Sequence, residues 1–197
     1  MPPKTLTLGF DTSAAHVAAA LLCDSEIIAV RGDMMSKGQA EHLLPMIEDM
    51  LSNVDKSWSD ITRIGVGVGP GNFTGIRISV SAARGLALSL NIPAIGINGF
   101  EIASHGMDTP WRALVDAPRD QVYMLENDGD NPSLLPRIDL SDCDMACCEF
   151  SALSATEIAI RIAKIAQNAP DSARPAPLYI RAADAAPPKD PLPQIVE

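Results

Sequence analysis

Two segments near the start of the chain carry the residue types that most often contact phosphate groups. Asp11, Thr12 and Ser13 place a carboxylate beside two hydroxyls, and residues 65–75 read Gly-Val-Gly-Val-Gly-Pro-Gly-Asn-Phe-Thr-Gly. Glycine lets backbone N–H groups approach an anion closely. A structural explanation stays open for both segments, because Asp-Thr-Ser also forms an ordinary Asx-type turn and glycines also permit a tight strand-to-helix turn. We treat Asp11, Thr12 and Ser13 as a candidate phosphate-facing turn.

The glycine-rich stretch differs from the standard phosphate-binding and nucleophile motifs. A dinucleotide fingerprint, Gly-x-Gly-x-x-Gly, would require glycine where the chain has Asn72 or Thr74. A Walker A loop ends in Gly-Lys-Ser/Thr, whereas this loop ends in Thr-Gly-Ile-Arg, and phenylalanine stands where a nucleophile elbow has its serine. Gly69, Gly71 and Gly75 are accordingly assigned a structural role in the loop.

The sequence offers no pattern for catalytic residues or metal ligands. His16, His42 and His105 lie far apart in the chain. Ribbon-type zinc sites need two Cys-x-x-Cys arms, and metalloprotease helices need His-Glu-x-x-His. The cysteines match neither arrangement, and they are Cys23, Cys143, Cys147 and Cys148. We predict reduced thiols without a chemical role, no metal site and no catalytic residue.

Composition and charge are typical of a globular protein that does not grip nucleic acid directly. The 197 residues are 47% hydrophobic and 20% charged, with a net charge of −10. Nucleic-acid binding draws most of its affinity from clustered Lys and Arg, which this balance opposes. The first residues lack the apolar core of a signal peptide, and no apolar run approaches a membrane span. We expect a cytoplasmic protein with no membrane partner.

The hydrophobic pattern of residues 5–97 predicts the order β-β-β-α-β-α, followed by one more short strand. Alternating apolar residues indicate strands, and apolar residues at spacings of three and four indicate helices. The strands are predicted at 5–11, 16–23, 26–32, 64–68 and 92–97, and the helices at 39–54 and 74–90. A meander followed by a crossover helix gives a mixed α/β sheet covered by helices, as in one lobe of an actin-like or sugar-kinase-like ATPase.

The second half of the chain gives weaker signals. The predicted elements are a short helix at 101–107, strands at 112–116 and 121–126, and a turn-rich loop at 127–136. Ser154 and Glu157 have the spacing of a capping box, which predicts a helix from there to about residue 167. We divide the chain into an N-terminal lobe, residues 1–99, and a smaller C-terminal lobe, residues 100–197, which ends in a proline-rich tail.

Several of these segments together resemble the bacterial TsaB family, also called YeaZ. They are Phe10-Asp11-Thr12-Ser13, Glu41-His42-Leu43-Leu44-Pro45, Gly69-Pro70-Gly71-Asn72-Phe73-Thr74-Gly75-Ile76-Arg77 and Gly85-Leu86-Ala87, with weaker matches at 115–123 and 177–181. The resemblance implies the ASKHA fold that actin and sugar kinases share. The stretch between Tyr123 and Pro177 is shorter than the family usually has, which implies a reduced second lobe.

The resemblance also implies a function, namely a non-catalytic subunit of the machinery that makes threonylcarbamoyladenosine beside the tRNA anticodon. The implied partners are TsaD, a catalytic relative with the same fold, and the ATPase TsaE. This chain would act as a scaffold or activator and meet tRNA only indirectly. It would hold no cofactor of its own, and any ATP or ADP would lie at the complex interface. Two other classes stay open: an actin-like small-molecule kinase or ATPase, and a peptidase.

The two predicted N-terminal helices are the candidate partner surface. The residues assigned to it are Leu43, Ile47, Met50, Gly75, Ser79, Ala82, Ala83 and Leu86. Small side chains let another helix approach closely, and Gly85 is interpreted as a place where backbone meets backbone. Two helices of a similarly folded TsaD could complete a four-helix contact, and a second copy could do so when the protein is alone. The alternative is that this face packs only on its own sheet.

Overall fold

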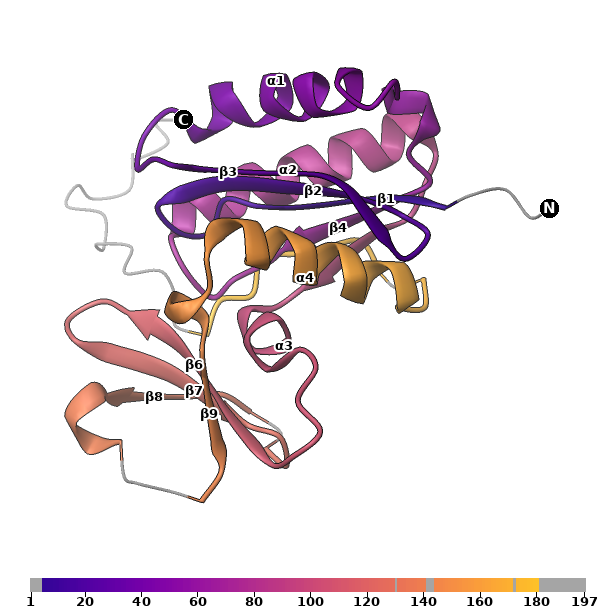
Figure 1. Ribbon diagram of the computed structural model, residues 1–197. Coiled ribbons are helices and arrows are strands. Elements are labelled where there is room, and N and C mark those ends of the chain that lie inside the picture. Colours follow the sequence, from indigo (N-terminus) through magenta and orange to yellow (C-terminus); the bar gives the residue numbers. More distant parts are fainter. Residues whose placement is uncertain (1–4, 130, 141–143, 172, 181–197) are drawn as a thin grey trace, which may run out of the picture.

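The computed structural model describes residues 5–129, 131–140, 144–171 and 173–180, and it contains two sheets, one above the other in Figure 1. The first sheet has the strand order β3-β2-β1-β4-β5. Its strands are β1 (Leu6–Asp11), β2 (His16–Cys23), β3 (Glu26–Met34), β4 (Arg63–Gly67) and β5 (Ala94–Ile97). β1 pairs antiparallel with β2 and parallel with β4. The predicted mixed α/β sheet of ASKHA type is confirmed.

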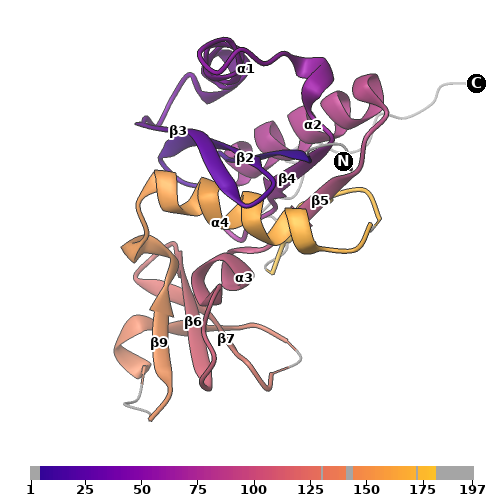
Figure 2. The same cartoon turned by 45° about the vertical axis from the view of Figure 1, so that its right-hand side comes forward.

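Helices cover both faces of the first sheet. α1 (Gln39–Ser52) and α2 (Phe73–Leu90) lie on one face, and α4 (Ala155–Asn168) lies on the other (Figures 1 and 2). α1 buries the apolar residues that recur at spacings of three and four, among them Leu43, Ile47 and Leu51. Pro45 is the seventh residue of α1, beyond the first turn in which proline is tolerated best, so one hydrogen bond of the helix is not made there.

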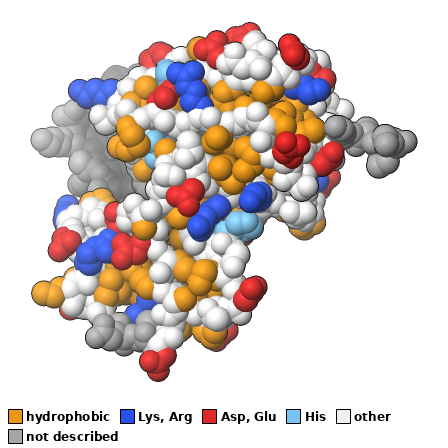
Figure 3. Space-filling view, viewed as in Figure 1, with side chains coloured by type: hydrophobic (Ala, Val, Ile, Leu, Met, Phe, Trp, Pro, Cys, Tyr) orange, Lys and Arg blue, Asp and Glu red, His pale blue; other side chains and the backbone are white. Residues whose placement is uncertain are grey.

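The edge strand β3 leaves one apolar area uncovered. Figure 3 shows hydrophobic side chains gathered over this strand, between α1 and α4, and Ile27 and Val30 are 37% and 41% exposed there. Among the described residues, no helix has both the length and the apolar composition needed to cross a membrane.

α4 follows the second sheet in the chain but contacts all strands of the first sheet. The close approach depends on two strand glycines, since a Cβ atom at Gly9 would lie 2.5 Å from the backbone nitrogen of Ala163. A Cβ at Gly65 would lie 2.6 Å from the Cβ of Ala166. The division of the chain at residue 99 stays a prediction, and the observed packing places α4 with the first lobe. The capping box at Ser154 and Glu157 is present at the start of this helix.

The second sheet has the strand order β8-β7-β6-β9 and is covered in part by α3 (Gly99–Ser104). Its strands are β6 (Trp111–Ala117), β7 (Gln121–Glu126), β8 (Ser133–Pro136) and β9 (Ala146–Glu149). β6 and β7 were expected from the sequence, whereas β8 lies in the segment predicted as a loop and β9 was not predicted. Both are edge strands of four residues, too short for alternation to be distinctive.

Most residues assigned to the partner surface lie in the core of this chain. Leu43, Ile47, Ser79 and Ala83 have at most 1% of their surface exposed. Met50 and Gly75 are also buried, and Ala82 and Leu86 are partly buried. The apolar stripe of an amphipathic helix packs first on its own sheet, so a partner surface on these helices has to be formed by their outward residues.

Gly85 lies in the middle of α2 with nothing within 4 Å of the position that its Cβ would occupy. The fold of this chain therefore does not require glycine there. We expect Gly85→Ala to raise the free energy of unfolding by about 1 kcal/mol, because alanine has the higher helix propensity. Urea denaturation of the variant and the wild type measures this difference. A loss of stability would show that glycine at position 85 serves the fold in some other way.

Candidate functional site

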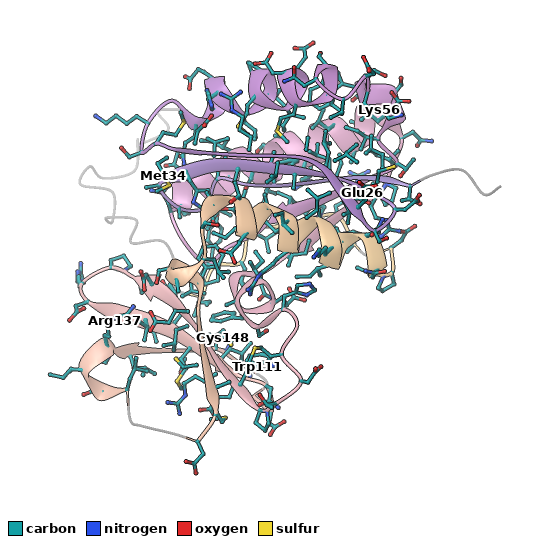
Figure 4. The ribbon with its side chains drawn as sticks, in the orientation of Figure 1. Glu26, Met34, Lys56, Trp111, Arg137 and Cys148 are labelled. Carbon is teal, nitrogen blue, oxygen red and sulfur yellow. The ribbon has the colours of Figure 1, made fainter. Side chains whose placement is uncertain are left out.

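A cleft of about 820 Å³ lies between the two sheets. It is lined by the turn after β1, the end of β3, the glycine-rich loop, the turn after β6, and the start of α4. In Figure 4, Met34 lies at the end of β3 nearer the second sheet, and Glu26 lies at the opposite end. The cleft thus collects side chains from both halves of the chain at one end of the first sheet.

A buried hydrogen-bond network holds the turn after β1. Oδ2 of Asp11 accepts from the backbone N–H of Ser13 at 2.8 Å and from its hydroxyl at 2.9 Å. The same oxygen lies 2.8 Å from Nε2 of His16. These three residues are 0%, 3% and 4% exposed. The Asx-type turn that the sequence left open is therefore present, and it is closed by a histidine five residues further on.

The polar groups of this turn form hydrogen bonds with the glycine-rich loop, with the start of α2 and with α1. Thr12 donates its hydroxyl to the carbonyl of Gly75 at 2.6 Å, and the N–H of Asn72 donates to the carbonyl of Ser13 at 2.7 Å. The side-chain amide of Gln39 donates to two further carbonyls of the turn, at 2.7 and 2.8 Å. Asp11 and Thr12 have no exposed surface, so Ser13 alone of the candidate phosphate-facing residues lines the cleft.

The glycines of the loop make this contact with the turn sterically possible. A Cβ atom at Gly75 would lie 1.9 Å from the carbonyl oxygen of Thr12, and one at Gly71 would lie 2.5 Å from that of Ser13. Gly69 has a φ of 92°, which residues other than glycine rarely adopt. The backbone of the glycine-rich loop therefore lies directly against the backbone of the turn after β1.

The cleft carries almost no charge. Among the described residues that line it there is no Lys or Arg, and its carboxylate, Asp116, forms an ion pair with Arg137. No group of three or more His, Cys, Asp or Glu among the described residues is arranged to hold a metal ion. Burial raises the pKa of the Cys148 thiol, whereas Cys143 lies outside the described residues.

A second depression, a shallow groove of about 400 Å³, lies between α1 and α2. It is lined by Ala40, Leu43, Leu44, Arg77, Ile78, Ser81 and Ala82, which we call the α1–α2 groove. Leu44 in this lining is 41% exposed, and Leu88 further along α2 is 78% exposed. Of the residues assigned to a partner surface from the sequence, Leu43 and Ala82 line this groove. The other residues that line the groove were not assigned from the sequence, because they flank the main apolar stripe of each helix.

Near the start of α2, three side chains stack together. The guanidinium carbon of Arg77 lies 3.7 Å from the ring centre of Phe73, and its Nε donates to the hydroxyl of Tyr179 at 3.0 Å. The N–H of Leu178 donates to the carbonyl of Val68 at 2.8 Å. The segment that ends with Ile180 is thereby held beside the glycine-rich loop, and Arg181 lies outside the described residues.

An Asp–His pair joins β3 to α1. Asp33 accepts from Nε2 of His42 at 2.7 Å and from Nε of Arg31 at 3.1 Å. The hydrogen bond with His42 is the main cause that holds the pKa of Asp33 below its ordinary value, and Arg31 adds to it.

The sequence of this chain matches a family model and several known proteins. The family model described as TsaD, tRNA N6-adenosine threonylcarbamoyltransferase, matches residues 30–179. The TsaB proteins of Escherichia coli K12 and Bacillus subtilis 168, named for tRNA threonylcarbamoyladenosine biosynthesis, are 32% and 34% identical over 127 and 119 residues. These matches cover 60% and 59% of this chain and 53% and 52% of the relatives, so the chain spans about half the length of the curated relatives it matches.

A solved structure shares the fold over nearly the whole length. The structure of YeaZ from Pseudomonas aeruginosa is 22% identical, with a TM-score of 0.71, and the match covers 89% of this chain and 99% of that one. At this identity the likeness shows the arrangement of elements alone.

Proposed function

Because the chain belongs to the family whose model is described as TsaD, and within it resembles the TsaB (YeaZ) proteins, we propose that it serves the biosynthesis of threonylcarbamoyladenosine in tRNA. Its role would be that of a non-catalytic scaffold or activator that binds the catalytic subunit TsaD, with the ATPase TsaE as a further partner. The net charge of −10 supports a protein that meets tRNA only through its partners. The location in our proposal is the cytoplasm.

The observation that carries this proposal is the exposed α1–α2 groove. Its lining is mostly small and apolar, with Arg77 and Ser81 as the polar members. Leu44 in this lining is exposed, and Leu88 adds exposed apolar surface further along α2. An apolar depression between two parallel ridges suits a helix or helix pair of a similarly folded partner. TsaD is such a partner in our proposal, and a second copy of this chain would take the same place when TsaD is absent.

Ala82→Arg, which introduces a charge into the groove, is expected to weaken the complex with TsaD of the same organism at least about tenfold. Ala82 is partly buried in the lining of the groove, and a bulky charge there would be desolvated by the partner. Leu44→Arg on α1 tests the same surface from the other helix. Co-purification and titration of the two proteins measure the affinity, and thermal unfolding checks that each variant folds.

Asn168→Arg is the matched control, since this exposed residue ends α4 on the opposite face of the first sheet. It should leave the affinity unchanged. If both groove variants fold and still bind as the wild type does, the contact lies elsewhere. If the wild-type chain does not bind TsaD, the proposed function itself is wrong.

The kinase or ATPase alternative is tested on the isolated protein. We expect negligible ATP turnover, because Asp11 and Thr12 are enclosed and the described lining of the cleft offers phosphates no Lys or Arg. Release of inorganic phosphate from ATP is the measurement. Steady turnover would favour the kinase class, and cleavage of a peptide library by the same sample would favour the peptidase class.

A further inference from the structure

The cleft between the two sheets contains one imidazole among its described lining residues, that of His16. It is 4% exposed, yet the residue lines the cleft. Its Nε2 lies 2.8 Å from Oδ2 of Asp11, which itself does not line the cleft. The carboxylate of Asp11 accepts at this contact, so Nε2 carries a proton, and in the neutral tautomer of the ring Nδ1 is an acceptor.

Nδ1 of His16 has no hydrogen-bond partner among the described residues, and it lies on the ring edge away from Asp11. The atom is not among the enclosed polar atoms without partners, which are Oγ1 of Thr7 and Oδ1 of Asp11. The residue itself lines the cleft. A buried imidazole that is oriented by a carboxylate and has one unpartnered nitrogen is a fixed acceptor for a donor on a bound molecule.

The remainder of the cleft wall is mainly apolar. Val115 and Tyr123 contribute from the second sheet, and Phe150, Leu153 and Ile158 from the segment that leads into α4. The volume of about 820 Å³ lies in the range of sites for small molecules. Because no Lys or Arg is present in the described lining, a ligand that carries phosphates would lose hydration without gaining a cation.

We propose that this cleft is a binding site for a small, uncharged aromatic molecule that donates one hydrogen bond to Nδ1 of His16. The apolar wall takes the ring, and the imidazole selects molecules with an N–H or O–H group. The bound molecule would touch both sheets, so it would stabilise their relative arrangement. This ligand site goes beyond the proposed scaffold function, and binding to TsaD does not depend on it.

Indole and 1-methylindole are the probes that test the hydrogen bond, because they share a ring and differ in the N–H donor. Titration of the full chain, followed by NMR of the imidazole nitrogens, is expected to show indole binding roughly three- to tenfold more tightly, the ratio that one neutral hydrogen bond contributes. The His16 nitrogen signals should shift with indole, and those of His42 should not. ATP should bind no better than 1-methylindole.

Two variants locate the probe. His16→Ala should bring the two indoles to equal affinity, and Ala15→Trp should abolish binding of both, because Ala15 is exposed and lines the cleft. Ala15→Trp changes no buried group, so it remains informative if His16→Ala does not fold. Equal affinity of the two indoles for the wild type, tighter binding of ATP, or no binding of indole at millimolar concentration would each overturn the proposal.

Discussion

Replacing Gly9 with alanine is expected to lower the free energy of unfolding by roughly 3 kcal/mol, although the change adds a single methyl group. The new Cβ would lie 2.5 Å from the nitrogen of Ala163 and 2.7 Å from the carbonyl oxygen of Ala159. Both atoms belong to the backbone of α4, so no side-chain rotation relieves the clash. The helix has to move away from the sheet and leave the core beneath it less well packed.

Gly85→Ala is the matched control for this experiment, because the same substitution at a position with open space is expected to stabilise the protein. Opposite shifts of the urea midpoint in the two variants would show that packing against α4, and not glycine content as such, decides the result. Equal midpoints for Gly9→Ala and the wild type would contradict the observed contact between β1 and α4.

The two strand glycines also show how far the sequence alone could lead. The capping box at Ser154 and Glu157 predicted where α4 starts, and the structure has the helix at Ala155–Asn168. Which sheet it covers was not predicted, because hydrophobic periodicity gives the apolar face of a helix without naming its partner. A signal was present: Gly9 and Gly65 interrupt apolar strands, and glycine inside a strand marks close approach of another backbone.

The helix surfaces illustrate a different limit. Periodicity correctly predicted two amphipathic helices, but it could not tell a stripe that packs on the sheet from one that meets a partner. Leu43 and Ile47 belong to the first kind, whereas Leu44 and Leu88 are exposed. The residues that flank an apolar stripe do not follow its periodicity. Their solvent exposure is known only from the structure, in which the sheet covers the stripe.

The network around Asp11 was also outside the reach of sequence patterns. His16 was counted as an isolated histidine, because no motif joins it to an acid five residues earlier. The antiparallel pairing of β1 with β2 brings the two together, and register Asp11↔Ala18 places the turn residues between them over the end of the sheet. Contacts of this kind depend on the turn conformation, which the identity of Asp-Thr-Ser suggested but did not fix.

Asp11→Ala is therefore expected to cost roughly 3–5 kcal/mol of unfolding free energy, the range for breaking a buried charged contact. The substitution would leave the N–H and hydroxyl of Ser13 and the Nε2 of His16 without their acceptor, in a part of the structure that is nearly free of solvent. Each buried donor left unpaired adds its own desolvation cost. Urea denaturation and the thermal midpoint measure the loss.

Asp33→Ala supplies the comparison, because Asp33 also pairs with a histidine, at 2.7 Å, but its side chain is 33% exposed. Water can replace the lost contacts there, so we expect a cost below about 1 kcal/mol. The two variants thus remove the same kind of pair from the interior and from the surface. A large loss confined to Asp11 would mean that this residue holds the turn that lines the cleft and orients His16. If Asp11→Ala unfolds at the wild-type midpoint, the carboxylate is dispensable for the fold, and a role at a bound ligand would become the better explanation for its presence.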